Sequence, residues 1–142
     1  MTPHAFPVRV YYEDTDSAGV VYYANYLRYF ERARTEWLRA LGFEQTDLAA
    51  QHHVVFVVRS INVEYLQPAR FNDELQITLE LGEPGASQIV FVQRVLRGMD
   101  GPEVRSEVLS EARVRVACVS LLTMKPVRIP KIIATRIRTK TT

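Results

Sequence analysis

The sequence predicts an α+β domain in which one long helix packs on a five-stranded antiparallel sheet. Three observations support this prediction. The chain has 142 residues, a length that suits one compact domain. Apolar residues recur at spacings of three and four over one long stretch, from about Asn25 to Leu41. The other apolar runs are short, mostly alternate with polar residues and are separated mainly by short turns, which favours antiparallel strands.

The first strand is predicted at residues 7–13, PVRVYYE, where apolar and polar side chains alternate. Three carboxylates, Glu13, Asp14 and Asp16, lie at the end of this strand. The segment 17–19, Ser-Ala-Gly, then supplies the small residues that are typical of a turn.

The long helix is predicted from its periodic apolar face. That face comprises Tyr26, Tyr29, Phe30, Ala33, Trp37 and Leu41. Asn25 is the expected N-cap, because its side chain can accept a hydrogen bond from a free backbone N–H. Gly42 is expected just after the helix, because glycine adopts a positive φ without steric strain. A short helical piece is expected at about 45–51.

Four strands are predicted after the helix, at 54–66, 73–81, 88–97 and 103–119. The segment 88–97 is apolar on both faces for much of its length, so we expect it at the centre of the sheet. The last strand is long enough that we expect a bend or a bulge. Turns are expected at 82–87 and 98–102, and a frayed or surface tail at 131–142. A single helix leaves a sheet edge and apolar surface uncovered, so we expect an obligate oligomer.

The composition is ordinary for a globular protein, with 47% hydrophobic and 24% charged residues. The formal net charge of +2 is too small to indicate nucleic-acid binding. Cys118 is the single cysteine, so no internal disulfide can form, which fits the cytoplasm. The N-terminus lacks a signal-peptide pattern, and the short apolar runs do not reach a bilayer span. We therefore expect a cytoplasmic protein without a transmembrane segment.

The acidic turn does not match a metal site. DTDSAG resembles the start of a calcium loop, but its fifth residue is Ala18 and the twelfth is Asn25, so expected oxygen ligands are missing. The three histidines are scattered and have no cysteine nearby for zinc. No G-x-S-x-G motif is present, and Cys118 falls in a predicted buried strand, so no nucleophilic triad is expected.

A carboxylate just before a helix start suggests a different chemistry. The first N–H groups of a helix are unpaired and can stabilise a developing oxyanion. A carboxylate a few residues upstream can reach the same carbonyl carbon, as nucleophile or as base for water. The pattern alone is equally compatible with an acidic strand end and a solvated turn.

The segment DTDSAGVVYYANYLRYFERARTEWLRALG resembles the 4-hydroxybenzoyl-CoA thioesterase family of hotdog-fold proteins. It is most similar to the Tol–Pal-associated acyl-CoA thioesterase branch. The likeness continues in order through VVRSINVEYLQPARFNDELQI, VFVQRV, EARVRVACV and MKPVRIP, from about Val8 to Pro130. It implies a single hotdog domain over 1–142, with the long helix wrapped by the sheet. It also implies homodimers with a continuous sheet, often paired into tetramers, and active sites at the subunit interface.

The family motif implies a role for individual residues. Asp16 matches the catalytic carboxylate, and Tyr23 matches the residue whose backbone N–H binds the oxyanion. Asp14 would then cap the turn, and Glu13 would face solvent. The substrate-binding residues implied are Gly19, Val20, Val21, Tyr22, Arg59 and Ser60. We expect Tyr22 and Tyr23 either to line an aromatic pocket or to pack the helix start, and we favour packing.

Two departures from the family pattern bear on the substrate. Many members of the Tol–Pal branch carry His where this chain has Tyr23, and a tyrosine side chain, with a pKa of about 10, is no base at neutral pH. The basic cluster that holds CoA phosphates in some relatives is replaced by GASQI before the fourth strand. Other cations would then bind the phosphates, and the candidates are Arg59, Arg70, Lys125 and Arg128.

The resemblance implies hydrolysis of an acyl thioester, carried either on CoA or on an acyl carrier protein, with no metal and no cofactor. The alternative is a non-catalytic module of the same fold that binds acyl thioesters or an acyl carrier protein. A hotdog dehydratase would require an Asp–His pair, and DTDSAGVVYYANY contains no histidine.

Overall fold

The computed structural model describes residues 4–83, 85–98 and 107–141. The described residues form five strands, three α-helices and one short 3₁₀ helix. The strands are β1 (His4–Arg9), β2 (Val54–Tyr65), β3 (Glu74–Leu81), β4 (Gln88–Arg97) and β5 (Glu107–Ser120). The helices are η1 (Tyr12–Asp14), α1 (Asn25–Ala40), α2 (Gln45–His52) and α3 (Lys131–Thr141). The predicted ranges of the second to fourth strands and of the short helix agree with β2, β3, β4 and α2 to within one residue at each end. Part of the predicted fifth strand lies outside the described residues.

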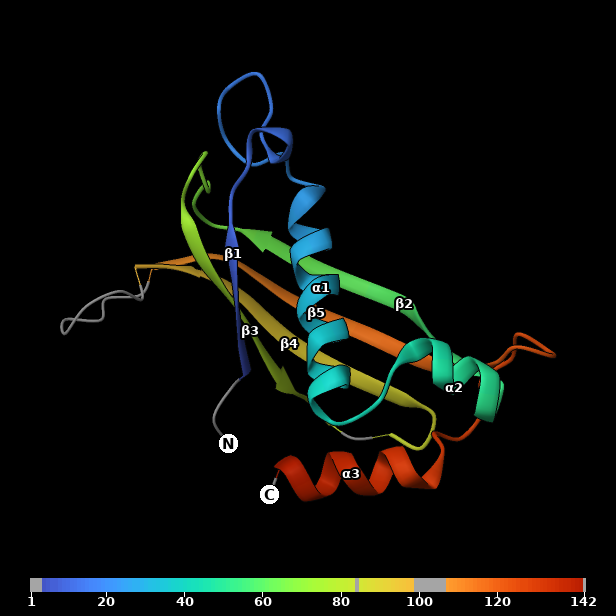
Figure 1. The fold of residues 1–142 in the computed structure, drawn as a ribbon. Coiled ribbons are helices and arrows are strands. Elements are labelled where there is room, and N and C mark those ends of the chain that lie inside the picture. Colours follow the sequence, from blue (N-terminus) through green and yellow to red (C-terminus); the bar gives the residue numbers. More distant parts are fainter. Residues whose placement is uncertain (1–3, 84, 99–106, 142) are drawn as a thin grey trace.

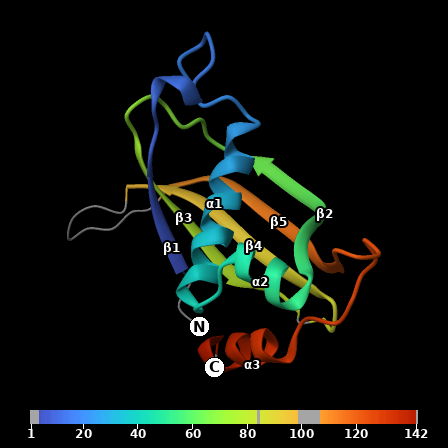
Figure 2. The ribbon, with the colours of Figure 1, turned by 45° about the vertical axis from the view of Figure 1, so that its right-hand side comes forward.

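The strands form one antiparallel sheet in the order β1-β3-β4-β5-β2. Figures 1 and 2 show α1 lying across one face of this sheet. The predicted α+β fold with a five-stranded antiparallel sheet is confirmed, and β4 is the central strand, as its two apolar faces indicated. The strands β2 and β3 follow each other in sequence but are not neighbours, so the expectation that short connections join adjacent strands is wrong at this point.

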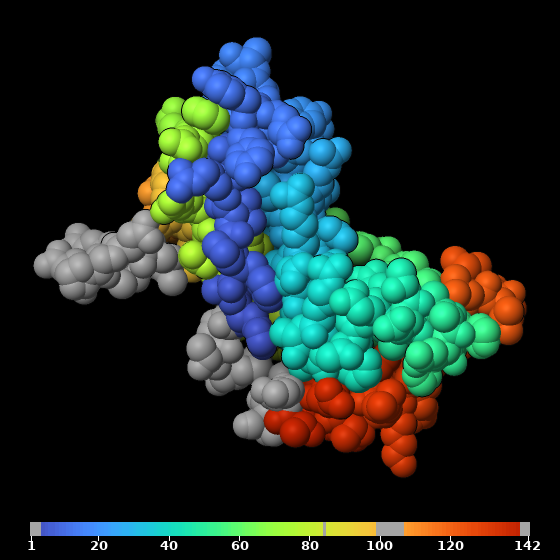
Figure 3. Space-filling model, in the orientation of Figure 1, coloured from blue at the N-terminus to red at the C-terminus, as the bar shows by residue number. Residues whose placement is uncertain are grey.

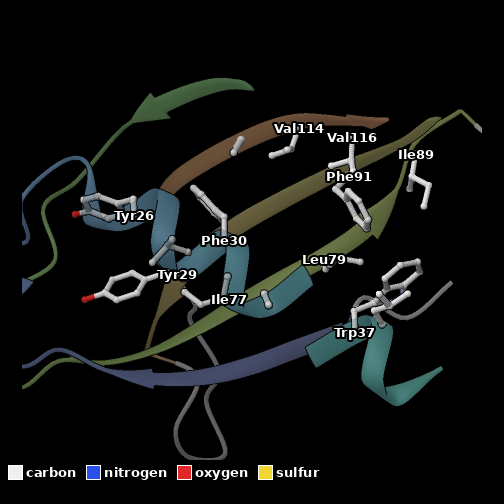
Figure 4. Packing of buried hydrophobic residues seen from close by; sticks show 14 of the residues in the cluster. Tyr26, Tyr29, Phe30, Trp37, Ile77, Leu79, Ile89, Phe91, Val114 and Val116 are labelled. Atoms are coloured by element: carbon white, nitrogen blue, oxygen red, sulfur yellow. The ribbon is translucent and has the colours of Figure 1, made fainter. Parts of the chain in front are cut away.

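The apolar face of α1 packs on the centre of the sheet (Figure 4). All six residues predicted for that face are buried. The Trp37 ring meets the Phe91 ring of β4 edge-on, with centroids 5.2 Å apart. The buried Gln93 of β4 donates a hydrogen bond to the Phe30 carbonyl and accepts one from Arg34, both at 3.0 Å. These bonds satisfy a polar side chain in the core and fix the helix relative to β4.

Two β-bulges bend the sheet. Along β5, Leu109 is skipped in the pairing with β4, where Val95 faces Ser110 and the next residue faces Val108. The predicted irregularity of the last strand is therefore confirmed. Along β2, Arg59 is skipped in the pairing with β5. Each extra residue strengthens the local twist of its strand.

The first strand and the helix start differ from the prediction. The strand β1 ends at Arg9, because the chain turns into η1 instead of continuing extended to residue 13. Ala24, not Asn25, is the N-cap of α1, so that prediction is wrong. The Asn25 side chain instead donates a hydrogen bond of 2.8 Å to the Asp14 carbonyl, which ties the helix start to η1. Gly42 follows the helix with φ +98°, as predicted.

The prediction of a frayed tail after Pro130 is wrong. Residues 131–141 form α3, which lies against the end of the molecule that contains the C-terminus of α1 (Figure 3). Ile133 is fully buried, and the Arg136 guanidinium donates a hydrogen bond of 2.6 Å to the Leu41 carbonyl. The predicted turn at 98–102 lies outside the described residues except for Gly98. No helix among the described residues is long and apolar enough to cross a membrane.

Candidate active site

The segment from Thr15 to Val21 forms a tight loop at one end of α1 (Figure 1). Thr15 and Val21 close the loop as an antiparallel bridge. Inside it, the Asp16 N–H donates to the Val20 carbonyl at 2.9 Å, and the Gly19 N–H donates to the Asp16 carbonyl at 3.0 Å. These backbone bonds hold Asp16 at a defined position although the loop lies on the surface.

Gly19 is required by the loop conformation. Its φ is +80°, a value that residues with a Cβ rarely adopt. Apart from the glycine and its two chain neighbours, no heavy atom lies within 4 Å of the place that a Cβ would occupy. The chain therefore leaves open space beside Gly19, and a ligand can approach the backbone there.

Asp16 and Asp14 are held differently. One carboxylate oxygen of Asp16, Oδ1, accepts the Ala18 N–H at 2.8 Å, while Oδ2 has no hydrogen-bond partner in the described part of the chain. The carboxylate of Asp14 accepts the Tyr11 N–H at 2.9 Å, so the prediction that Asp14 caps the turn is confirmed. Glu13 is exposed, as predicted. Of the three acids, Asp16 is the one that is both exposed and held by a backbone N–H, because Asp14 is half-buried and Glu13 accepts no such bond among the described residues.

Unpaired amides lie at the start of α1. The Asp14 carbonyl accepts the Tyr22 N–H at 2.9 Å, and the Tyr22 carbonyl accepts the Asn25 N–H at 2.8 Å. Within the described residues the N–H groups of Tyr23 and Ala24 have no acceptor. Unpaired amides at a helix N-terminus carry a partial positive charge and favour a bound anion.

An aromatic cluster surrounds these amides. Tyr23 is 61% exposed, and its ring lies 4.7 Å from that of Tyr22, which is also exposed. Tyr65, at the end of β2, meets the Tyr23 ring edge-on and donates its hydroxyl to the Tyr23 carbonyl at 3.0 Å. Tyr26 and Tyr29 are the tyrosines that are buried near the start of α1, and the favoured packing role of Tyr22 and Tyr23 stays a prediction. Partial burial raises the pKa of Tyr65, so this donor stays protonated at neutral pH.

The remaining predicted residues are not all on the loop surface. Val21 is buried in the core, whereas Val20 is only partly buried. Arg59 and Ser60 are exposed at the middle of β2, and Tyr65 of this strand contacts Tyr23 at the start of α1.

Two residues near the loop were not singled out from the sequence. Tyr65 could not be found, because its contact with Tyr23 spans 42 residues. Arg70 was one candidate among four cations, and the structure pairs its backbone with Val20 as a bridge. Arg70 is thus the cation whose backbone adjoins the loop.

Asp16 lies outside three hollows formed by the described residues of one chain. Hollows of about 640, 550 and 130 Å³ lie between α3 and the β3–β4 end, between β1 and α1, and between α1 and the β2 side of the sheet. Neither Asp16 nor Tyr23 lines any of the three. The described residues also contain no group of three or more His, Cys, Asp or Glu side chains suited to a metal ion.

The known proteins to which this chain is similar include thioesterases. The family model of the thioesterase-like superfamily matches residues 10–137. The acyl-CoA thioesterase YbgC of Haemophilus influenzae is 47% identical over 127 residues, which cover 89% of this chain and 88% of the relative. A crystal structure of a probable thioesterase from Bartonella henselae is 35% identical, with a TM-score of 0.82 over 91% of this chain and all of that one.

A more distant structure shares the fold alone. It is a mutant of 4-hydroxybenzoyl CoA thioesterase complexed with 4-hydroxybenzoyl CoA. It has 18% identity and a TM-score of 0.85 over 94% of this chain and 97% of that one.

Proposed function

Because the chain belongs to the thioesterase-like superfamily and is an acyl-CoA thioester hydrolase with the hotdog fold, we propose that Asp16 and the backbone N–H of Tyr23 carry out its chemistry. One observation carries this proposal. The free oxygen of Asp16 belongs to the loop, and the unpaired amide of Tyr23 directly follows the bond from the Tyr22 N–H to the Asp14 carbonyl, which joins the two sides of that loop. A carboxylate and an oxyanion donor are the two groups that attack on a thioester carbonyl requires.

The reaction begins at the thioester carbonyl carbon. Asp16 either attacks this carbon and forms an acyl-enzyme anhydride, which water then hydrolyses, or removes a proton from the water that attacks it. In both routes negative charge develops on the carbonyl oxygen, where the Tyr23 N–H donates a hydrogen bond. The C–S bond breaks as the oxyanion collapses, and the CoA thiolate leaves. One such donor is worth about a hundredfold or more in rate.

The rest of the site follows from the loop. Gly19 leaves room for the thioester, Val20 and Tyr22 line the acyl group, and Val21 supports them from the core. Arg70 adjoins this surface and is our first candidate for a CoA phosphate. Arg59 and Ser60 would act from the second strand of a partner subunit.

We propose that the active form is a homodimer or a homotetramer built through β2. This strand is a 12-residue sheet edge that pairs on one side only, with β5. Unpaired edges of this length are commonly covered by another chain. A two-fold antiparallel pairing of β2 with its copy is centred between Arg59 and Ser60, the midpoint of the strand. Such pairing gives one continuous sheet and places both residues at the interface.

The substrate class is an acyl-CoA, and an acyl group on a carrier protein is a further candidate. We propose a cytoplasmic location, which the single buried, reduced Cys118 supports. The non-catalytic alternative is not favoured, because the curated relatives are named as thioesterases over most of the chain.

Hydrolysis of a substrate panel by wild type and two variants tests the assignment. The panel comprises acyl-CoAs from acetyl to palmitoyl, 4-hydroxybenzoyl-CoA, and the preferred acyl group loaded on a carrier protein. Asp16→Asn is expected to lose at least about a hundredfold in kcat on every substrate, because the amide is neither a base nor a nucleophile. Glu13→Gln makes the same chemical change at an exposed neighbour and is expected to keep wild-type kcat. Near-wild-type hydrolysis by a folded Asp16→Asn protein would sink the proposal.

A further inference from the structure

Two exposed apolar groups lie at opposite ends of the edge strand β2. The first is the aromatic cluster beside Asp16, at the C-terminal end of the strand. It comprises Tyr22, Tyr23 and Tyr65, and the exposed Leu66 follows Tyr65 in the chain. The second is the hairpin that follows β5, here called the 121–125 hairpin, where Leu122 is 82% exposed and Met124 is 61% exposed. Large exposed apolar side chains gathered in this way mark surfaces that meet a partner or a ligand.

The 121–125 hairpin is firmly attached to the start of β2. The Leu121 N–H donates to the carbonyl of His53, the residue just before β2, at 2.9 Å. The hairpin is closed by bonds from the Ser120 N–H to the Lys125 carbonyl at 3.0 Å and from the Met124 N–H to the Ser120 carbonyl at 2.7 Å. Figures 1 and 2 show it as the orange loop that projects at the edge of the molecule. Its apolar tip is therefore presented in a fixed position.

The pairing geometry of β2 brings the two groups together. In a two-fold antiparallel pair of 12-residue strands in full register, Val54 of one copy lies opposite Tyr65 of the other. The hairpin, bonded next to Val54, then arrives beside Tyr65 of the second copy. Tyr65 is bonded to the Tyr23 carbonyl, so the hairpin tip reaches the aromatic cluster beside Asp16. A register shift of two residues displaces the tip by only about 7 Å.

The charge distribution favours a second copy as the occupant. Residues 112–142 hold eight Lys and Arg and no acid, whereas residues 1–111 hold the other ten cations and all 16 acids. The hairpin itself carries one charged residue, Lys125, and the segment from Glu13 to Asp16 carries three acids. Lys125 of a second copy can therefore pair with this acidic segment, in addition to the apolar contacts of the hairpin.

We propose that the 121–125 hairpin of a second copy covers the acyl site beside Asp16, and that Leu122 and Met124 help to select the acyl group. This inference rests on the proposed function, because it assigns a further wall to that same site. It gives Asp16, which lies outside the three hollows of a single chain, a pocket that two copies build together. It also gives Leu122 and Met124, exposed in a single chain, an apolar partner.

The substrate profile of a hairpin variant tests the proposal. In Leu122→Ser/Met124→Ser, the loss of kcat/KM is expected to grow with the apolar size of the acyl group, to about tenfold or more for the best long or aromatic substrate. Ile132→Ser, which alters an apolar residue of α3 that is 52% exposed, is the matched control and is expected to keep the wild-type profile. A profile that is unchanged in the hairpin variant, or that falls equally for acetyl-CoA and the best substrate, overturns the inference.

A cross-link tests the geometry independently of activity. In Leu66→Cys/Leu122→Cys, a short bismaleimide is expected to join two chains, while each single variant stays largely unjoined. A cross-link within one chain, or none at all, overturns the inference and points to a different occupant of the hairpin. Failure here is distinguishable from failure of the proposed function. If Asp16→Asn is inactive but the hairpin results are negative, only the hairpin assignment is wrong, and if Asp16→Asn is active, the catalytic assignment is wrong as well.

Discussion

The two ends of α1 differ in whether their terminal backbone groups are hydrogen-bonded. At the N-terminal end, the Tyr23 and Ala24 N–H groups have no acceptor among the described residues, and the surrounding tyrosines are exposed. At the C-terminal end, the N–H groups of Gly42 and Phe43 donate hydrogen bonds to carbonyls of the last turn, at 2.8 and 3.1 Å. The Arg136 guanidinium donates a hydrogen bond to the Leu41 carbonyl. One end of the helix is left open and the other is closed by α3.

This difference separates stability from activity along one helix. A closed helix end satisfies its carbonyls and buries apolar side chains, so changes there act on the free energy of unfolding. An open end keeps donors available for a ligand and contributes less to stability. Variants at the two ends should therefore affect different measurements, and three variants test this from the largest expected effect to the smallest.

The largest effect is expected at the closed end. Ile133→Ala removes a fully buried side chain of α3 and is expected to lower the free energy of unfolding by about 2–5 kcal/mol. The kcat of the folded protein should not change, because the loop that carries Asp16 lies at the other end of α1. Urea unfolding and a steady-state assay on the same sample measure both quantities. Ile132→Ala, at the exposed neighbour, is the control, and an equal loss in both variants would contradict the packing of α3.

An intermediate effect is expected where the open end is joined to η1. Asn25→Ala deletes the hydrogen bond to the Asp14 carbonyl, which keeps its second donor, the Tyr22 N–H. The free energy of unfolding should fall by about 1 kcal/mol. The kcat should also fall, by more than the small decrease in the folded fraction explains, because the bond fixes the loop relative to the amides at the start of α1. Thermal unfolding and kcat together decide this, and an unchanged kcat would show that the bond has no part in positioning the loop.

The sequence predicted the elements whose pattern is local. The periodic face of α1, the two-sided apolar run of β4 and the glycine after the helix each depend on neighbouring residues and were found. The tail that is α3 was missed because its apolar residues are few and its charges suggested a solvated segment. Pro130 directly before it is a helix-start signal that could have indicated it, but the burial of Ile133 depends on contacts with distant elements.

In the candidate site too, relations between neighbouring residues were predicted and contacts between distant residues were not. The local pattern placed a carboxylate just before the helix start, and the family resemblance then selected Asp16 and Tyr23 and separated Asp14 as a capping residue. The local pattern gave Asn25 the wrong role, since Asn25 is the first residue of α1 and its side-chain N–H donates to the Asp14 carbonyl. It could not find Tyr65, whose position depends on how β2 runs past the helix start. The catalytic roles of Asp16 and Tyr23 remain predictions for the assays above.

The smallest effect is expected from the Tyr65 hydroxyl. Tyr65→Phe keeps the ring against Tyr23 and removes only the hydrogen bond to the Tyr23 carbonyl, which orients the peptide unit next to the Tyr23 N–H. We expect kcat to fall by about twofold to tenfold, the equivalent of a single exposed neutral hydrogen bond of about 0.5–1.5 kcal/mol. Tyr12→Phe is the matched control, because the Tyr12 ring stacks on Phe71 and its hydroxyl has no partner among the described residues.

The pH dependence of this effect is fixed by the direction of the pKa shift. Partial burial raises the pKa of Tyr65 in the folded protein, so the donor is fully present below its ordinary pKa of about 10 and is lost only as the pH rises through the higher folded value. The ratio of wild-type to Tyr65→Phe kcat should therefore stay constant from about pH 6 to about pH 9. A ratio that falls within this range would show that a group other than the Tyr65 hydroxyl orients the Tyr23 carbonyl.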